Sequence, residues 1–100
     1  MPHLLQVDFP YAGPWGAEMT VAMDDMARSI AQEPGLIWKI WTENQQQGEA
    51  GGIYLFDEAS QARAYLDKHA RRLAGFGIPV VNGKIFEVNE PLSLMNRAPL

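Results

Sequence analysis

The sequence contains no cysteine, which excludes disulfides, thiolate metal sites, iron–sulfur clusters and cysteine nucleophiles. It also has no excess of positive charge. The eight lysines and arginines are outnumbered by twelve acidic residues, giving a net charge of −4. Because a nucleic-acid-binding face needs clustered cations, we expect no nucleic-acid partner.

Long apolar runs are missing as well. None approaches the ~18 residues of a membrane span, and the first segment, "MPHLLQVDFP", lacks the charged flank and long apolar region of a signal peptide. We therefore expect a cytoplasmic protein with no membrane contact. The length of 100 residues, with 47% hydrophobic and 20% charged residues, predicts one globular domain over 1–100, in which 91–100 form a C-terminal tail.

Four extended segments are predicted. Residues 3–9 alternate between apolar and mixed side chains, and residues 36–43 and 50–56 are rich in β-formers on either side of the polar "NQQQGE", which predicts a hairpin. Residues 78–88 form the fourth. Its Asn82-Gly83 pair fits a bulge or kink better than a two-residue hairpin turn, because the arms of such a hairpin would be very short.

Two helices lie between these segments. Apolar residues recur at helical spacing from about residue 15 to 32, between Gly-Pro and Pro-Gly pairs that mark the boundaries. A second helix is expected from a cap at Asp57 to the "GFG" segment, and its charges match the helix dipole. His69 falls on the apolar stripe of this helix, with Tyr65 on its flank.

The order β-α-β-β-α-β predicts the ferredoxin-like α+β fold, a four-stranded antiparallel sheet with both helices on one face. The other face of the sheet is then bare. Side chains of a strand alternate between faces, so "GLIWKIWTE" contributes one row to each. The predicted helix-side row is Leu36, Trp38, Ile40 and Thr42, and the row on the bare face is Ile37, Lys39, Trp41 and Glu43.

This assignment predicts a homodimer. Burying one tryptophan contributes on the order of 4 to 6 kcal/mol of transfer free energy at ~25 cal/mol/Å², so Trp41 favours cover by a second copy packed sheet to sheet. Ile37 would share that interface, and Lys39 and Glu43 would pair across it or reach its rim. The apolar tail from Pro91 would reach over the partner subunit.

The segments "EPGLIWKIWTE", "EAGGIYLF", "AYLDKHARRL" and "VNEPLS" resemble the YdhR family, whose members are related to the antibiotic-biosynthesis monooxygenases. The resemblance covers nearly the whole chain. It implies a dimeric α/β barrel, in which two ferredoxin-like sheets face one another with the helices outside. It also implies similarity to enzymes that oxidise aromatic or quinol-like compounds with dioxygen and no bound metal or flavin. Fold alone does not fix such chemistry.

Chemistry of this kind needs a mostly apolar pocket, a general base and hydrogen-bond donors for the developing oxyanion. His69 is the candidate base or hydrogen-bond partner of the substrate, although a structural histidine that is hydrogen-bonded to a backbone carbonyl or to Tyr54 or Tyr65 is the simpler explanation. Tyr54 is a candidate phenol donor on a face that alternation alone cannot assign. The candidate substrate-binding residues, each of which could equally belong to the core or anchor a helix, are Trp38, Tyr65, Trp15 and Met23.

No metal site or phosphate-binding loop is predicted, and no cofactor is expected. The resemblance, together with an inward histidine among aromatic residues, implies a cofactor-independent monooxygenase acting on a small aromatic, phenolic or quinol-like compound. The alternative is a dimeric module that binds a small aromatic ligand without turning it over. Haem degradation through an axial histidine is a third possibility.

Overall fold

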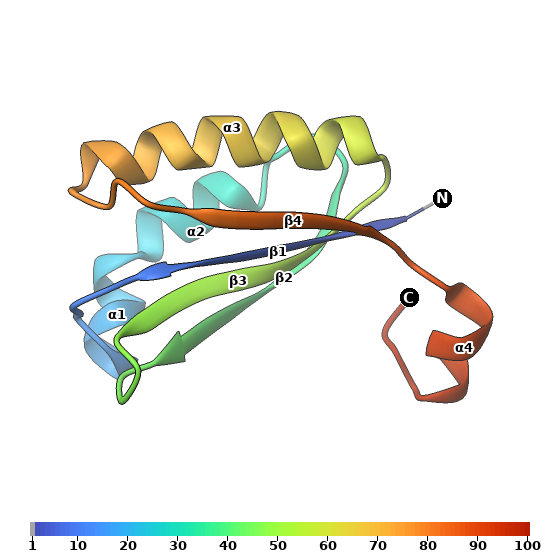
Figure 1. The fold of residues 1–100 in the computed structure, drawn as a ribbon, viewed down its shortest axis with the longest axis horizontal. Helices are drawn as coiled ribbons and strands as arrows, with labels where there is room; N and C mark the ends of the chain where they lie inside the picture. The colour runs from blue at the N-terminus through green and yellow to red at the C-terminus, as the bar shows by residue number, and fades with distance from the viewer. Residues whose placement is uncertain (1) are drawn as a thin grey trace.

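The fold is described by a computed structural model over residues 2–100. Four antiparallel strands form one sheet in the order β2-β3-β1-β4, and three helices cover one of its faces (Figure 1). This confirms the ferredoxin-like α+β prediction. The strands are β1 (His3–Pro10), β2 (Leu36–Asn44), β3 (Glu49–Phe56) and β4 (Asn82–Glu87), and the helices are α1 (Gly16–Ala22), α2 (Asp24–Ile30), α3 (Ala59–Gly75) and α4 (Glu90–Met95).

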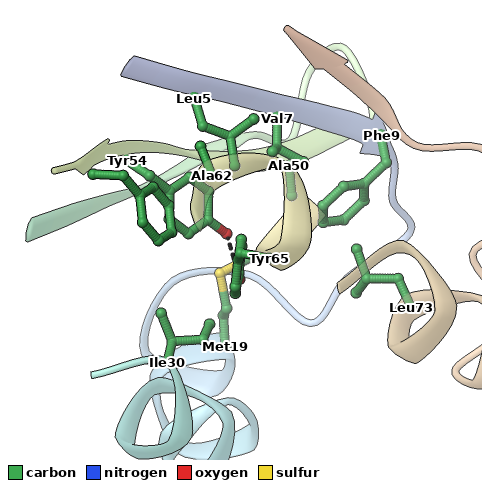
Figure 2. Packing of buried hydrophobic residues seen from close by; sticks show 11 residues of the cluster. Leu5, Val7, Phe9, Met19, Ile30, Ala50, Tyr54, Ala62, Tyr65 and Leu73 are labelled. Atoms are coloured by element: carbon green, nitrogen blue, oxygen red, sulfur yellow. Dashed lines mark hydrogen bonds between the residues drawn. The ribbon is translucent and has the colours of Figure 1, made fainter. Parts of the chain in front are cut away.

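The core lies between the sheet and α1, α2 and α3. Alternate residues of β1 and β3 point into it, and they meet the apolar stripe of α3 and one residue from each short helix (Figure 2). Its larger members are Leu5, Val7, Phe9, Met19, Ile30, Tyr54, Phe56, Tyr65 and Leu73. Tyr54 is therefore on the helix-covered face, and Tyr65 is buried rather than on the flank of its helix.

A β-bulge in β2 reverses the predicted faces of that strand. Leu36 lies opposite Phe56 but Trp38 lies opposite Leu55, so Ile37 is an extra residue. A single inserted residue moves every later side chain to the other face. The predicted rows are therefore wrong beyond Ile37: Lys39, Trp41 and Glu43 lie on the helix-covered face, whereas Trp38, Ile40 and Thr42 lie on the open face.

The single helix predicted over residues 15–32 is also wrong, because the chain forms two short helices. Met23, between them, has ψ of 8°, far from the ~−42° of an α-helix. Backbone hydrogen bonds from Met23 to Met19 (2.8 Å) and from Ala27 to Met23 (2.9 Å) still span the break. No glycine or proline marks this position in the sequence.

The start of α3 lies one residue later than predicted. Its N-cap is Glu58 rather than Asp57, and the Glu58 backbone N–H donates to Gln61 Oε1 at 3.1 Å in a capping box. At the start of the helix, the side chains of Glu58 and Gln61 thus each accept a hydrogen bond from the backbone N–H of the other residue. Its end at Gly75 agrees with the predicted stop at "GFG".

β4 begins at Asn82, directly opposite Asp8 of β1, and Gly83 follows in regular register opposite Val7. The predicted bulge and the alternative hairpin turn are therefore both wrong. Leu66 of α3 occupies the space that a Cβ at Gly83 would fill. This glycine allows α3 to pack directly against β4.

The C-terminal residues were expected to form a tail without regular structure, but the first of them belong to the short helix α4. Asn89 caps α4 by accepting a hydrogen bond from the Leu92 backbone N–H at 3.2 Å. After the helix the chain returns to the sheet, where Trp38 Nε1 donates to the Pro99 carbonyl at 2.9 Å. Within this structure the tail therefore packs on its own chain, at the end of the sheet and apart from the other three helices (Figure 1).

Candidate functional site

A small cavity, here called the inner cavity, lies between the helix-covered face of the sheet and α1 to α3. Its free volume is about 30 Å³. β1 and β3 contribute aromatic rings from one side, α3 contributes a histidine, and β2 contributes a lysine and a tryptophan. The lining residues with titratable or aromatic side chains are Phe9, Tyr11, Lys39, Trp41, Tyr54 and His69.

A wider space, here called the outer groove, opens beside the inner cavity between β2 and the two short helices. Its volume is about 300 Å³. Met19, Met23 and Trp41 line both spaces and form the partition between them. Asp24 and Glu43 lie at the groove, and Glu43 Oε1 accepts a hydrogen bond from the Gly16 backbone N–H at 2.8 Å.

Lys39 is the cation of the inner cavity. Its Nζ lies 3.4 Å from the centroid of the Trp41 ring and 4.7 Å from that of Tyr54. Burial, followed by repulsion from Arg72, lowers the pKa of Lys39 to about 7. A large share of this side chain is therefore a neutral amine at neutral pH. The sequence predicts Lys39 on the bare face, but the bulge at Ile37 turns its side chain to the helix-covered face.

His69 is 2% exposed and points into the cavity from α3. Its partner is Arg72 rather than a carbonyl or a tyrosine: His69 Nδ1 lies 3.0 Å from Arg72 Nη2. Because a guanidinium can only donate, Nδ1 must accept, which places the imidazole proton on Nε2. Burial, followed by the charges of Lys39 and Arg72, lowers the pKa of His69 to about 3. His69 is thus a neutral donor through Nε2.

Tyr54 and Tyr65 form a buried pair, with their hydroxyl oxygens 3.0 Å apart (Figure 2). Burial raises the pKa of Tyr54, and it raises the pKa of Tyr65 to about 12. Both phenols therefore stay protonated. Tyr54 lines the cavity, whereas Tyr65 lies behind it and stacks on His69 at a centroid distance of 5.0 Å. Tyr65 therefore holds the rings of Tyr54 and His69 in position.

No sequence pattern marks Tyr11, because it lies in the irregular segment after β1. Its ring lines the inner cavity, and its buried hydroxyl has no hydrogen-bond partner among residues 2–100. A buried polar group without a partner is costly, and it marks a place for a water or ligand atom. Trp15 contacts the Tyr11 ring edge-on at 5.1 Å and supports this wall from outside the cavity.

Trp38 lies on the open face, so its predicted placement under the helices is wrong, and Trp41 takes the place of the aromatic wall. Met23 lines both spaces. Among residues 2–100, no group of three or more acidic or histidine side chains is arranged to hold a metal ion. None of the helices described is both long enough and apolar enough to span a membrane.

The fold and the site together define a small ferredoxin-like α+β protein with an aromatic cavity that contains a lysine of lowered pKa. A family model described as "Putative mono-oxygenase ydhR" matches residues 4–99. The chain therefore belongs to this family, and the resemblance seen in the sequence is confirmed. No curated protein matches the chain.

Proposed function

We propose that this protein is a cofactor-independent monooxygenase that acts on a small phenolic or quinol-like aromatic compound between the sheet and the helices. The observation that carries the proposal is the position of Lys39, whose amine lies over the rings of Trp41 and Tyr54 beside a groove of about 300 Å³. Membership of a family described as mono-oxygenases supports the same reaction class.

The proposed reaction begins with proton transfer. The neutral Lys39 amine removes the proton of a phenol, and the ammonium that forms stays beside the phenolate. The phenolate gives one electron to dioxygen, and the resulting phenoxyl radical and superoxide combine at a ring carbon. Lys39 returns the proton to the peroxide. Loss of water then leaves a quinone, with one oxygen atom of dioxygen in the product and the other in water.

His69 and Tyr11 are proposed as hydrogen-bond donors in this reaction rather than as bases. Arg72 occupies the only acceptor nitrogen of His69, and the pKa of about 3 leaves the ring a poor base at neutral pH. Its Nε2–H and the Tyr11 hydroxyl can donate to oxygen atoms that carry developing negative charge. Tyr54 lines the inner cavity with its hydroxyl held by Tyr65.

The test is oxygen uptake with 1-naphthol as the probe under isotopically labelled dioxygen. We expect labelled quinone from the wild type and at least a ~100-fold lower rate from Lys39→Met, the low end of what a lost general base costs. The rate should rise with pH through about 7, as the Lys39 amine loses its proton. Lys84→Met, an exposed lysine of β4, serves as the control and should retain activity.

Naphthol binding without oxygen uptake would contradict the enzyme and favour the ligand-binding module. Equal rates in the wild type and Lys39→Met would contradict the role of Lys39 alone. A Soret shift on titration with haem would instead support haem degradation, but the small free space around His69 does not favour it.

We also propose that the protein forms a homodimer through the open face of its sheet. That face carries Ile40 and Phe86, which are 52% and 45% exposed. Exposed apolar residues on an open sheet face, here on its two edge strands, favour cover by a second sheet. The interface residues differ from those first predicted, because the bulge places Ile40 rather than Trp41 on this face.

A further inference from the structure

The two spaces of the site differ about tenfold in volume, at about 30 and 300 Å³. Pockets that bind organic ligands usually measure ~300–1,000 Å³, whereas ~10–15 Å³ is enough for one water-sized molecule. An aromatic ring therefore fits only the outer groove. The inner cavity admits a single small molecule.

The inner cavity is lined mainly by apolar atoms. The residues that line it but not the groove include Phe9, Met26, Ala50, Leu73 and Ile78. Linings of this kind take up small apolar guests such as xenon. The polar atoms that the lining also holds, the Lys39 amine and the Tyr11 hydroxyl, can meet the anion that such a guest becomes on reduction.

Charge is distributed unequally between the two spaces. Within residues 2–100 the lining of the inner cavity includes the cation Lys39 and no carboxylate, and Arg72 lies directly behind His69. Asp24 and Glu43 lie at the outer groove. An anion that forms in the inner cavity would therefore meet positive charge, in a place where low dielectric strengthens the attraction.

We infer that the inner cavity is a dioxygen site and that the outer groove holds the aromatic ring against Trp41, Met19 and Met23. This inference rests on the proposed function, and it assigns the two substrates of that reaction, the phenol and dioxygen, to separate spaces. An electron passes from the phenolate in the groove to dioxygen in the cavity, so the phenolate is oxidised and dioxygen is reduced to superoxide beside Lys39. The phenoxyl radical and superoxide then combine where the two spaces adjoin, at Met19, Met23 and Trp41.

Paired variants test this division. Of the two spaces, Ala50 lines the inner cavity alone and Ala27 lines the groove alone, so the larger side chains of Ala50→Val and Ala27→Leu each fill one space and not the other. We expect Ala50→Val to raise the KM for dioxygen at least fivefold (about 1 kcal/mol) and leave the KM for 1-naphthol unchanged. Ala27→Leu should raise the KM for 1-naphthol at least fivefold and leave the KM for dioxygen unchanged. A rise in the naphthol KM with Ala50→Val, without a change for dioxygen, would overturn the inference.

Xenon provides a measurement that does not depend on activity. Xenon NMR of the wild type should show a bound signal that Ala50→Val abolishes and Ala27→Leu retains. If Ala50→Val fails to fold, Leu73→Phe, which also fills the inner cavity, replaces it. Oxygen uptake by the wild type without bound xenon would overturn the dioxygen cavity. Bound xenon that Ala50→Val abolishes, with no oxygen uptake by the wild type, would overturn the proposed function instead.

Discussion

Among single residues, His69 shows most directly how neighbours determine a protonation state. It is buried, it accepts from Arg72, and the charges of Lys39 and Arg72 both oppose its protonation. The same contacts that make it a donor in the cavity also affect stability. A protonated His69 would put a third cation next to two others in a space with little water.

Acid should therefore destabilise the protein through His69. The pKa of His69 is about 3 in the folded state against 6.5 for an unperturbed histidine. Between these values only the unfolded chain binds the proton, so the free energy of unfolding falls as the pH drops from 6.5 towards 3. We expect His69→Gln to lose this part of the acid dependence, measured as urea midpoints at about pH 7 and about pH 4.

The control is Ser60→Gln, which changes an exposed position of α3 that carries no titratable group and should keep the acid dependence of the wild type. The same change of midpoint with pH in the wild type and in His69→Gln would contradict the assignment.

The sequence pattern could predict His69 but not its partners. Helical spacing from Ala62 to Leu73 places it on the buried stripe, as the structure bears out. The Arg72 contact depends on side-chain rotamers, and Tyr11 lies in a segment without periodicity, so neither leaves a pattern to detect. Lys39 was assigned to the wrong face, since alternation counts residues and cannot detect an inserted one.

At the scale of elements, the strand order and the helix-covered face could be predicted because alternation in β1 and helical spacing in α3 are both regular. The bulge in β2 was not predictable in the same way. Ile37 is a large apolar residue between two others in "LIWKIW", so nothing in that segment distinguishes the extra residue. The extra residue at Ile37 thus determines that Trp41, rather than Trp38, lines the cavity.

Gly35 joins two elements at the start of β2. Its φ is +80°, its carbonyl accepts from the Asp57 backbone N–H at 2.9 Å, and a Cβ here would collide with the Gln61 side chain that caps α3. Gly35→Ala should therefore cost about 1–3 kcal/mol of unfolding free energy, through strain and the lost capping box. Urea denaturation measures this difference.

Gly75→Ala is the matched control in α3. A Cβ at this position meets nothing within 4 Å. The change should be neutral or stabilise the protein by up to ~1 kcal/mol, because alanine restricts the unfolded chain. Equal effects of the two substitutions would show that the Gly35–Gln61 contact does not hold the start of α3.

For the molecule as a whole, the two faces of the sheet have different covers. Helices cover one face and leave the inner cavity and the outer groove between themselves and the sheet. On the other face, the C-terminal segment covers one end, where Trp38 donates to Pro99 and Leu55 is buried. Ile40 and Phe86 remain exposed beyond it. The tail therefore limits, but does not remove, the apolar area available to a second copy.

The proposed homodimer makes a prediction about charge on the open face. Ile40→Glu would bury an unpaired carboxylate between two sheets, and because the interface is symmetric it would do so twice. We expect this variant to sediment as a monomer at micromolar concentration, where the wild type sediments as a dimer. Val21→Glu adds the same charge at a 79% exposed position on α1, away from that face, and should leave the dimer intact. A monomeric wild type, or an Ile40→Glu variant as dimeric as Val21→Glu, would exclude assembly through the sheet. In that case the exposed Ile40 and Phe86 would need another partner.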